Sequence, residues 1–296
     1  MSSPKDFEDF SASVEALFPG DENKLRRFYR SSRGIPLGYE HTGMLAELCD
    51  VKLDSAGFKE LTLGYVLLSS YYFLLDAVVD GHLEDVTDSV YLTQLLAGAL
   101  GKIDEAASLA NPTIRPKLRP LIFAHISQNA EAICTEKRLH AEPFELAIED
   151  ERRSIIGRSN SALLLYELIA EIYSCEPTRE SRIILEDIVY YLQLGDDLSD
   201  WREDFRASRR TLFLRRCVGG IGALPTERAL EEFVYLSGFY EEWAGDIVGG
   251  LSSISTLLHG RRPQPTGLIS LVDSQRMDLE NALRDWIAAK LYAARG

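Results

Sequence analysis

An acidic stripe occupies the segment 193–204, where Asp196, Asp200 and Asp204 follow one another at every fourth position. On a helix this spacing puts the three carboxylates on one face, with successive members roughly 6 Å apart along the axis. Like charges this close raise one another's pKa unless a positive charge lies among them, and a hard divalent cation such as Mg²⁺ is the usual solution. A solvated surface stripe would show the same pattern. The apolar run 188–194, which precedes the stripe and is typical of a helix that enters a core, favours the metal site.

A second pair of carboxylates has the same spacing. Asp76 and Asp80 end a run that is almost wholly apolar from Leu61 onward, and Gly81 is typical of a helix C-terminus. Anions are unfavourable at that end of a helix because the helix dipole is negative there. A helix end that simply reaches the surface is the alternative interpretation. Two such motifs in one chain favour a shared metal site.

A cluster of basic and polar residues lies between the two acidic motifs. Arg158, Ser159 and Asn160 are consecutive, and side chains of these types donate hydrogen bonds to phosphate oxygens, with added charge from the arginine. Arg209 and Arg210 follow the acidic stripe closely and could also contact a diphosphate. Solvated helix ends would place arginines in the same positions. We expect these five residues to bind a diphosphate group.

Together these residues indicate a specific chemistry. Two carboxylate clusters that face each other across a helical cavity, with arginines between them, can hold several Mg²⁺ ions against one diphosphate, which favours C–O cleavage to a carbocation. The rest of the cavity must exclude water, and aromatic faces there could stabilise cations. Tyr72, Phe73 and Gln193 are predicted to line it, although most aromatic residues in the chain are expected to be ordinary core. The residues expected to carry the ionisation are Asp76, Asp80, Asp200 and Arg158.

Helices are expected to position all of these residues. Long segments carry apolar residues at intervals of three and four, and prolines are few and lie at boundaries. No alternation of strands and helices is evident, so the fold class is predicted as all-α. The predicted helices are residues 8–17, 23–33, 41–49, 57–80, 87–108, 114–135, 142–157, 159–174, 179–206, 209–217, 226–248, 250–259 and 266–293.

Length and composition narrow the function classes. The 296 residues are 46% hydrophobic, which suits one large domain over 1–296. A net charge of −14 excludes nucleic acid as an expected partner because phosphate backbones require a basic footprint. The four cysteines lack zinc-site spacing. Neither a transmembrane segment nor a signal-peptide core is evident. These features predict a soluble, cytoplasmic protein.

The paired acidic motifs resemble those of the class I isoprenoid synthase superfamily. Gln193, Asp200, Glu203 and Asp204 are similar to the second motif of squalene and phytoene synthases, and the Asp196 stripe resembles the metal triad of terpene cyclases. The resemblance implies an antiparallel helical bundle around a central cavity, with Arg158-Ser159 in place of a Lys-Thr contact to diphosphate. It also implies a cluster of about three Mg²⁺ ions, with Mn²⁺ as the alternative metal. The implied metal ligands are Asp76, Asp80, Asp196, Asp200 and Asp204.

Departures from the family patterns bear on the reaction. The segment 81–85 lacks the paired arginines that follow the first motif in head-to-tail prenyl synthases, and the segment 154–160 lacks the Tyr and Val-Ala-Gly pattern of squalene and phytoene synthases. The sequence therefore lacks the second-substrate patterns both of head-to-tail prenyl synthases and of squalene and phytoene synthases. We predict a terpene cyclase that ionises one linear allylic prenyl diphosphate and releases pyrophosphate. The alternatives are a condensing synthase of squalene, phytoene or polyprenyl type, and a catalytically silent binding subunit. The oligomeric state is left open between a monomer and a homodimer.

Overall fold

The computed structural model describes residues 8, 10, 12–14, 16–17, 34–79, 86–141, 148–221 and 226–293. Within these ranges every regular element is a helix and none is a strand, which confirms the all-α prediction. The elements are α3 (Gly34–Leu48), α4 (Phe58–Val79), α5 (Val86–Ala110), the 3-10 helix η1 (Pro112–Ile114), α6 (Arg115–Ala141), α7 (Ile148–Arg158), α8 (Ser161–Ile172), α9 (Arg179–Arg206), α10 (Leu212–Ile221), α11 (Glu227–Leu236), α12 (Phe239–Gly260) and α13 (Thr266–Ala293).

The largest difference from the predicted helices lies near the C-terminus. A single helix over 226–248 and a second over 250–259 were wrong, because the chain breaks earlier, between α11 and α12. Gly238 has a φ of 91°, a left-handed conformation that glycine adopts without steric cost. Gly249 and Gly250 do not end the helix. A Cβ on Gly250 would lie 2.1 Å from the Tyr191 ring, so this glycine serves close packing inside a continuous helix. The predicted helix over 23–33 lies outside the described residues.

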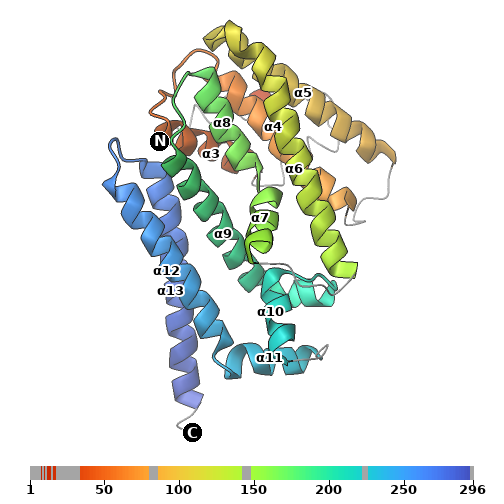
Figure 1. Ribbon diagram of the computed structural model, residues 1–296, viewed down its shortest axis with the longest axis vertical. Coiled ribbons are helices and arrows are strands. Elements are labelled where there is room, and N and C mark those ends of the chain that lie inside the picture. The colour runs from red at the N-terminus through yellow and green to blue at the C-terminus, as the bar shows by residue number, and fades with distance from the viewer. Residues whose placement is uncertain are drawn as a thin grey trace. The chain divides into compact units, whose positions relative to one another are not determined.

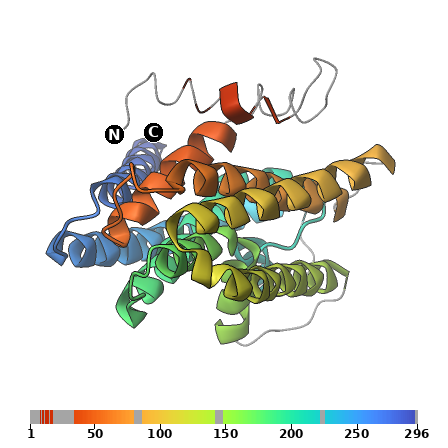
Figure 2. The ribbon, with the colours of Figure 1, turned by 90° about the horizontal axis from the view of Figure 1, so that it is seen from above.

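The chain divides into two compact units, and α6 contributes to both. The first comprises Met1–Ile126 and Ser161–Thr178. Its described core is built on α4, which packs along α5, as Figure 2 shows, and also contacts α3 and α8. The approach to α5 is close because Gly64 has no side chain: a Cβ there would lie 2.8 Å from Ile103 Cγ1. Continuous burial from Leu61 to Leu68 explains why this stretch is almost wholly apolar.

The second unit comprises Ser127–Asn160 and Arg179–Gly296. Its central element is α9, which contacts α7, α10, α12 and α13 (Figure 1). Trp201 of α9 is 1% exposed and packs against the rings of Phe213 and Tyr235, so aromatic contacts join α9 to α10 and α11. This packing fixes the register of α9 and therefore the direction in which its aspartates point.

None of the described helices is both long and apolar enough to cross a lipid bilayer. The expected single domain over 1–296 and its central cavity stay predictions.

Candidate functional site

The acidic stripe of α9 is divided by burial. Asp196 and Asp200 are exposed, whereas Asp204 is only 6% exposed. The reason is geometric: eight residues along a helix correspond to a rotation of about 80°, which turns Asp204 towards the core side. Arg209 Nη1 lies 3.2 Å from Asp204 Oδ1, and the Arg209 amide donates to the Asp204 carbonyl at 2.8 Å. Burial raises the pKa of Asp204 and Arg209 opposes that shift. The Asp204 carboxylate is therefore paired with an arginine, and its predicted role as a metal ligand stays a prediction.

Asp197, which lies outside the predicted set, is the most buried carboxylate of this segment at 3% exposure. Gln193 Nε2 lies 3.3 Å from Asp197 Oδ1 and also 3.3 Å from Asp196 Oδ2, so one amide bonds two neighbouring carboxylates. Burial raises the pKa of Asp197 to about 6, although Arg158 opposes the shift. The other oxygen, Oδ2, is buried and has no hydrogen-bond partner among the described residues. A half-satisfied buried carboxylate is uncommon and marks Asp197 as a functional candidate.

A signal for Asp197 was present in the sequence. The buried residues of this part of α9 are spaced by three or four positions, and Asp197 falls in that series between Leu194 and Trp201. A charged residue at a core position requires a partner. The four-residue stripe of Asp196 and Asp200 drew the prediction to the neighbouring face instead.

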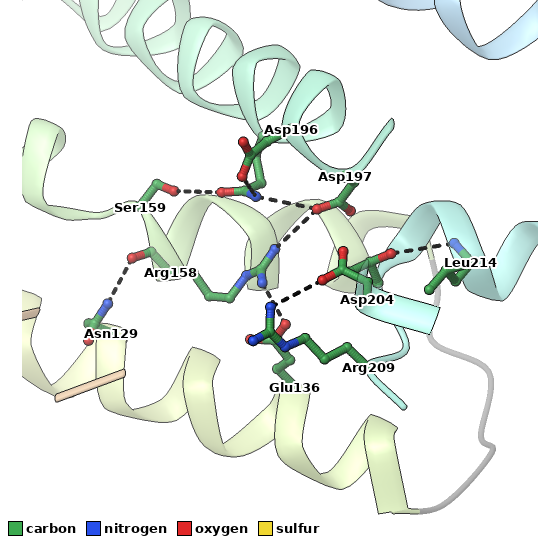
Figure 3. Close-up of polar contacts among 11 residues, drawn as sticks. Asn129, Glu136, Arg158, Ser159, Asp196, Asp197, Asp204, Arg209 and Leu214 are labelled. Atoms are coloured by element: carbon green, nitrogen blue, oxygen red, sulfur yellow. Dashed lines mark hydrogen bonds and ion pairs between the residues drawn. The ribbon is translucent and has the colours of Figure 1, made fainter. Parts of the chain in front are cut away.

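Arg158, at the end of α7, supplies that partner (Figure 3). Its Nη1 lies 2.5 Å from Glu136 Oε1, and its Nη2 lies 4.0 Å from Asp197 Oδ1. Ser159 Oγ donates to Gln193 Oε1 at 3.3 Å. Arg158 and Gln193 thus approach Asp197, and Ser159 is joined to this group through Gln193.

The other predicted diphosphate ligands differ in burial. Asn160 is 1% exposed, and its Nδ2 lies 3.3 Å from Gln128 Oε1, so this amide is engaged inside the unit. Arg209 is bound to Asp204, as described above. Arg210 precedes α10 and is partly exposed. Their contacts with a diphosphate stay predictions.

The first acidic motif is only partly described. Asp76 lies in the last turn of α4, its side chain is outside the described part, and Asp80 and Gly81 lie outside the described residues altogether. Tyr72 is 8% exposed, and burial raises the pKa of its hydroxyl above the usual range. Phe73, by contrast, is 64% exposed. The predicted metal and cavity roles of these residues stay predictions.

The donor types on α9 are suitable for a hard cation. Asp196 and Asp200 are exposed residues one turn apart. The pKa of the Asp196 carboxyl is raised, first by its partial removal from solvent and then by the charge of Asp200. No group of three or more Asp, Glu, His or Cys side chains already arranged for a metal occurs in the described part, to which the Asp76 and Asp80 side chains do not belong.

Three solved structures are similar to this chain over almost its whole length. A geranylgeranyl pyrophosphate synthase has a TM-score of 0.71 at 13% identity, covering 93% of this chain and 99% of the other. A decaprenyl diphosphate synthase from Rhodobacter capsulatus has a TM-score of 0.64 at 16% identity, covering 93% and 96%. An octaprenyl pyrophosphate synthase from Helicobacter pylori has a TM-score of 0.66 at 10% identity, covering 94% and 99%. The fold is that of prenyl diphosphate synthases.

The prenyl diphosphate synthase fold confirms the broad resemblance to isoprenoid synthases at the level of architecture. It does not support a particular closeness to squalene synthases or terpene cyclases, since the similar structures named above are all prenyl diphosphate synthases. No model of a protein family matches the sequence, and no curated protein matches it.

Proposed function

We propose that this chain is a Mg²⁺-dependent enzyme that acts on prenyl diphosphates and elongates them as a prenyl diphosphate synthase does. The observation that carries the proposal is the meeting of Arg158, Ser159, Gln193 and Asp197 at the α9 carboxylates, in a chain whose fold is that of such synthases. The likeness extends over 93% of the sequence, which supports residues 1–296 as one functional unit.

The side chains divide the work of binding. Asp196 and Asp200, whose side chains are exposed, would hold the metal through their carboxylates. Asp76 and Asp80 of the first acidic motif are the other proposed metal ligands. When bound, Mg²⁺ neutralises charge on the leaving diphosphate and favours C–O cleavage.

The protein's own cations complete the anion site. Arg158 has N–H groups beyond the one bound to Glu136, and these can donate to phosphate oxygens. The single hydroxyl hydrogen of Ser159 is donated to Gln193 Oε1, so Ser159 would donate to a phosphate oxygen in exchange for that bond. Asp204 orients Arg209 by the 3.2 Å contact, which keeps that arginine near the end of the acidic segment.

Cyclisation of a single substrate is the second candidate. The observation in its favour is that residues 81–85 contain neither arginine nor lysine, so a cationic site for a second diphosphate after the first acidic motif is lacking in the sequence. The two reactions share the ionisation step and differ in whether a second substrate enters.

Elongation and cyclisation can be distinguished by the products that each reaction forms. The purified chain is incubated with geranyl, farnesyl or geranylgeranyl diphosphate and Mg²⁺, with and without isopentenyl diphosphate. Elongation gives longer prenyl diphosphates only when isopentenyl diphosphate is present, whereas cyclisation releases pyrophosphate and a hydrocarbon or alcohol without it. Absence of Mg²⁺-dependent pyrophosphate release from every substrate would refute both.

A variant distinguishes either enzyme from a silent binding subunit. Asp200→Asn removes one exposed carboxylate charge while conserving shape, and a loss of about 10²-fold or more in turnover is expected because charge stabilisation of the leaving group is lost. Turnover in wild type that is unchanged in Asp200→Asn would contradict the assigned role of Asp200.

A further inference from the structure

One face of α6 binds and packs against the C-terminal end of α7, just before α8. Asn129, which is 2% exposed, donates through Nδ2 to the carbonyl oxygens of Gly157 at 3.2 Å and Arg158 at 2.9 Å. One turn further along α6, Ala132 packs against Gly157. A Cβ added to Gly157 would lie only 2.7 Å from the Cβ of Ala132. The next turn carries Glu136, whose carboxylate binds the Arg158 side chain. The backbone and the side chain of Arg158 are therefore both fixed from α6 (Figure 3).

The Arg158 guanidinium lies between two carboxylates of unequal burial. The Glu136 side chain is 17% exposed and makes a direct 2.5 Å contact with Nη1. The Asp197 side chain is 3% exposed, and its 4.0 Å separation from Nη2 is longer than a hydrogen bond. Asp197 is thus attracted to the arginine without being bonded to it.

Asp197 would be the stronger acceptor if Glu136 were absent. It is the more deeply buried of the two carboxylates, and its Oδ2 has no hydrogen-bond partner among the described residues. A buried anion gains more from direct pairing than an exposed one does, because less solvent screens the pair. Arg158 freed from Glu136 would therefore turn onto Asp197, and its N–H groups would be occupied by that carboxylate.

We propose that Glu136 is a positioning residue, which holds the Arg158 guanidinium off Asp197 so that N–H groups of Arg158 stay available to a diphosphate oxygen. The inference rests on the proposed function, since it assigns a support to the same anion site. Glu136 acts through Arg158 and need not touch the ligand.

The test measures binding of inorganic pyrophosphate in the presence of MgCl₂ to the full chain by isothermal titration calorimetry. Glu136→Gln keeps the size and an acceptor oxygen but removes the charge, and it is expected to weaken pyrophosphate binding about tenfold, the scale of one charge-assisted hydrogen bond. Glu136→Asp keeps the charge and should bind more tightly than Glu136→Gln. Glu131→Gln is the matched control, because it removes the same charge from an exposed position on the same helix.

Thermal melting of each variant separates positioning from stability. A purely structural role would lower the melting temperature of Glu136→Gln and leave the pyrophosphate affinity of the folded protein unchanged, and this result overturns the inference. Equal weakening in Glu131→Gln overturns it too, since the effect would then be general electrostatics. A wild-type chain that binds no pyrophosphate with Mg²⁺ overturns the proposed function and the inference together, whereas tight wild-type binding that Glu136→Gln preserves overturns the inference alone.

Discussion

The buried carboxylate of Asp197 should make the metal-free protein less stable as the pH rises. Its pKa is raised from 3.8 to about 6, first by burial, so the folded state favours the protonated form. A raised pKa contributes stability that is fully present below pH 4 and is lost as the pH rises through 6. Each unit corresponds to about 1.4 kcal/mol, which makes the contribution about 3 kcal/mol. Because Asp197 is 3% exposed, solvent screening requires little discount.

The assay compares urea unfolding of wild type and Asp197→Asn in EDTA between pH 4 and pH 7.5. The amide does not titrate, so the unfolding free energy of wild type should fall over this range by about 3 kcal/mol more than that of the variant. Asp246→Asn, at an exposed position on α12, is the control and should follow the wild-type profile. Parallel profiles for wild type and Asp197→Asn would refute the assignment of a raised pKa to this carboxyl.

Two further predictions concern packing and thiol reactivity in the second unit. Gly250→Ala should lower the free energy of unfolding in urea by about 1–3 kcal/mol, because the new Cβ would overlap the Tyr191 ring. Gly249→Ala is the control and should not destabilise the fold, since its Cβ would have no neighbour within 4 Å. Equal effects of the two substitutions would contradict the packing argument. Burial raises the pKa of the Cys217 thiol to about 12, whereas Cys134 is exposed. At pH 8 a colorimetric thiol reagent should therefore label Cys134 rapidly and Cys217 only on unfolding. Comparable labelling rates for the two thiols in the native protein would contradict this prediction.

The helices that were predicted best are those whose ends carry local signals. The predicted bounds of α9 and α13 agree with the structure, and each helix follows a proline-containing break at Pro177 or Pro265. The break between α11 and α12 was missed because its glycine competes with two more near position 250. Gly238 turns the chain, whereas Gly250 leaves room for the Tyr191 ring. Tertiary packing decides between these two roles, and the sequence pattern alone does not distinguish them.

The candidate site shows the same division between local and tertiary information. Arg158, Ser159 and Gln193 were predicted from residue type and position, and the structure brings them together. Glu136 was not predicted, because its partner is 22 residues away, beyond any helical periodicity. Asp197 had a local signal in its core spacing. The prediction followed the four-residue spacing of Asp196, Asp200 and Asp204 instead, and their role as metal ligands stays a prediction.

Burial divides the α9 aspartates into two chemical roles. Asp197 and Asp204 are buried and each lies near an arginine: Asp204 pairs directly with Arg209, whereas Asp197 lies 4.0 Å from Arg158, which is held by Glu136. Asp196 and Asp200 are exposed, and their repulsion is relieved best by an added cation. The proposed binding of a diphosphate in a chain of net charge −14 is consistent with this division, since two of the four aspartates lie near arginines of the protein and the other two would hold cations from solution. A uniformly exposed stripe could attract metal but would have no buried carboxylate to pair with Arg209, one of the arginines proposed to bind the diphosphate.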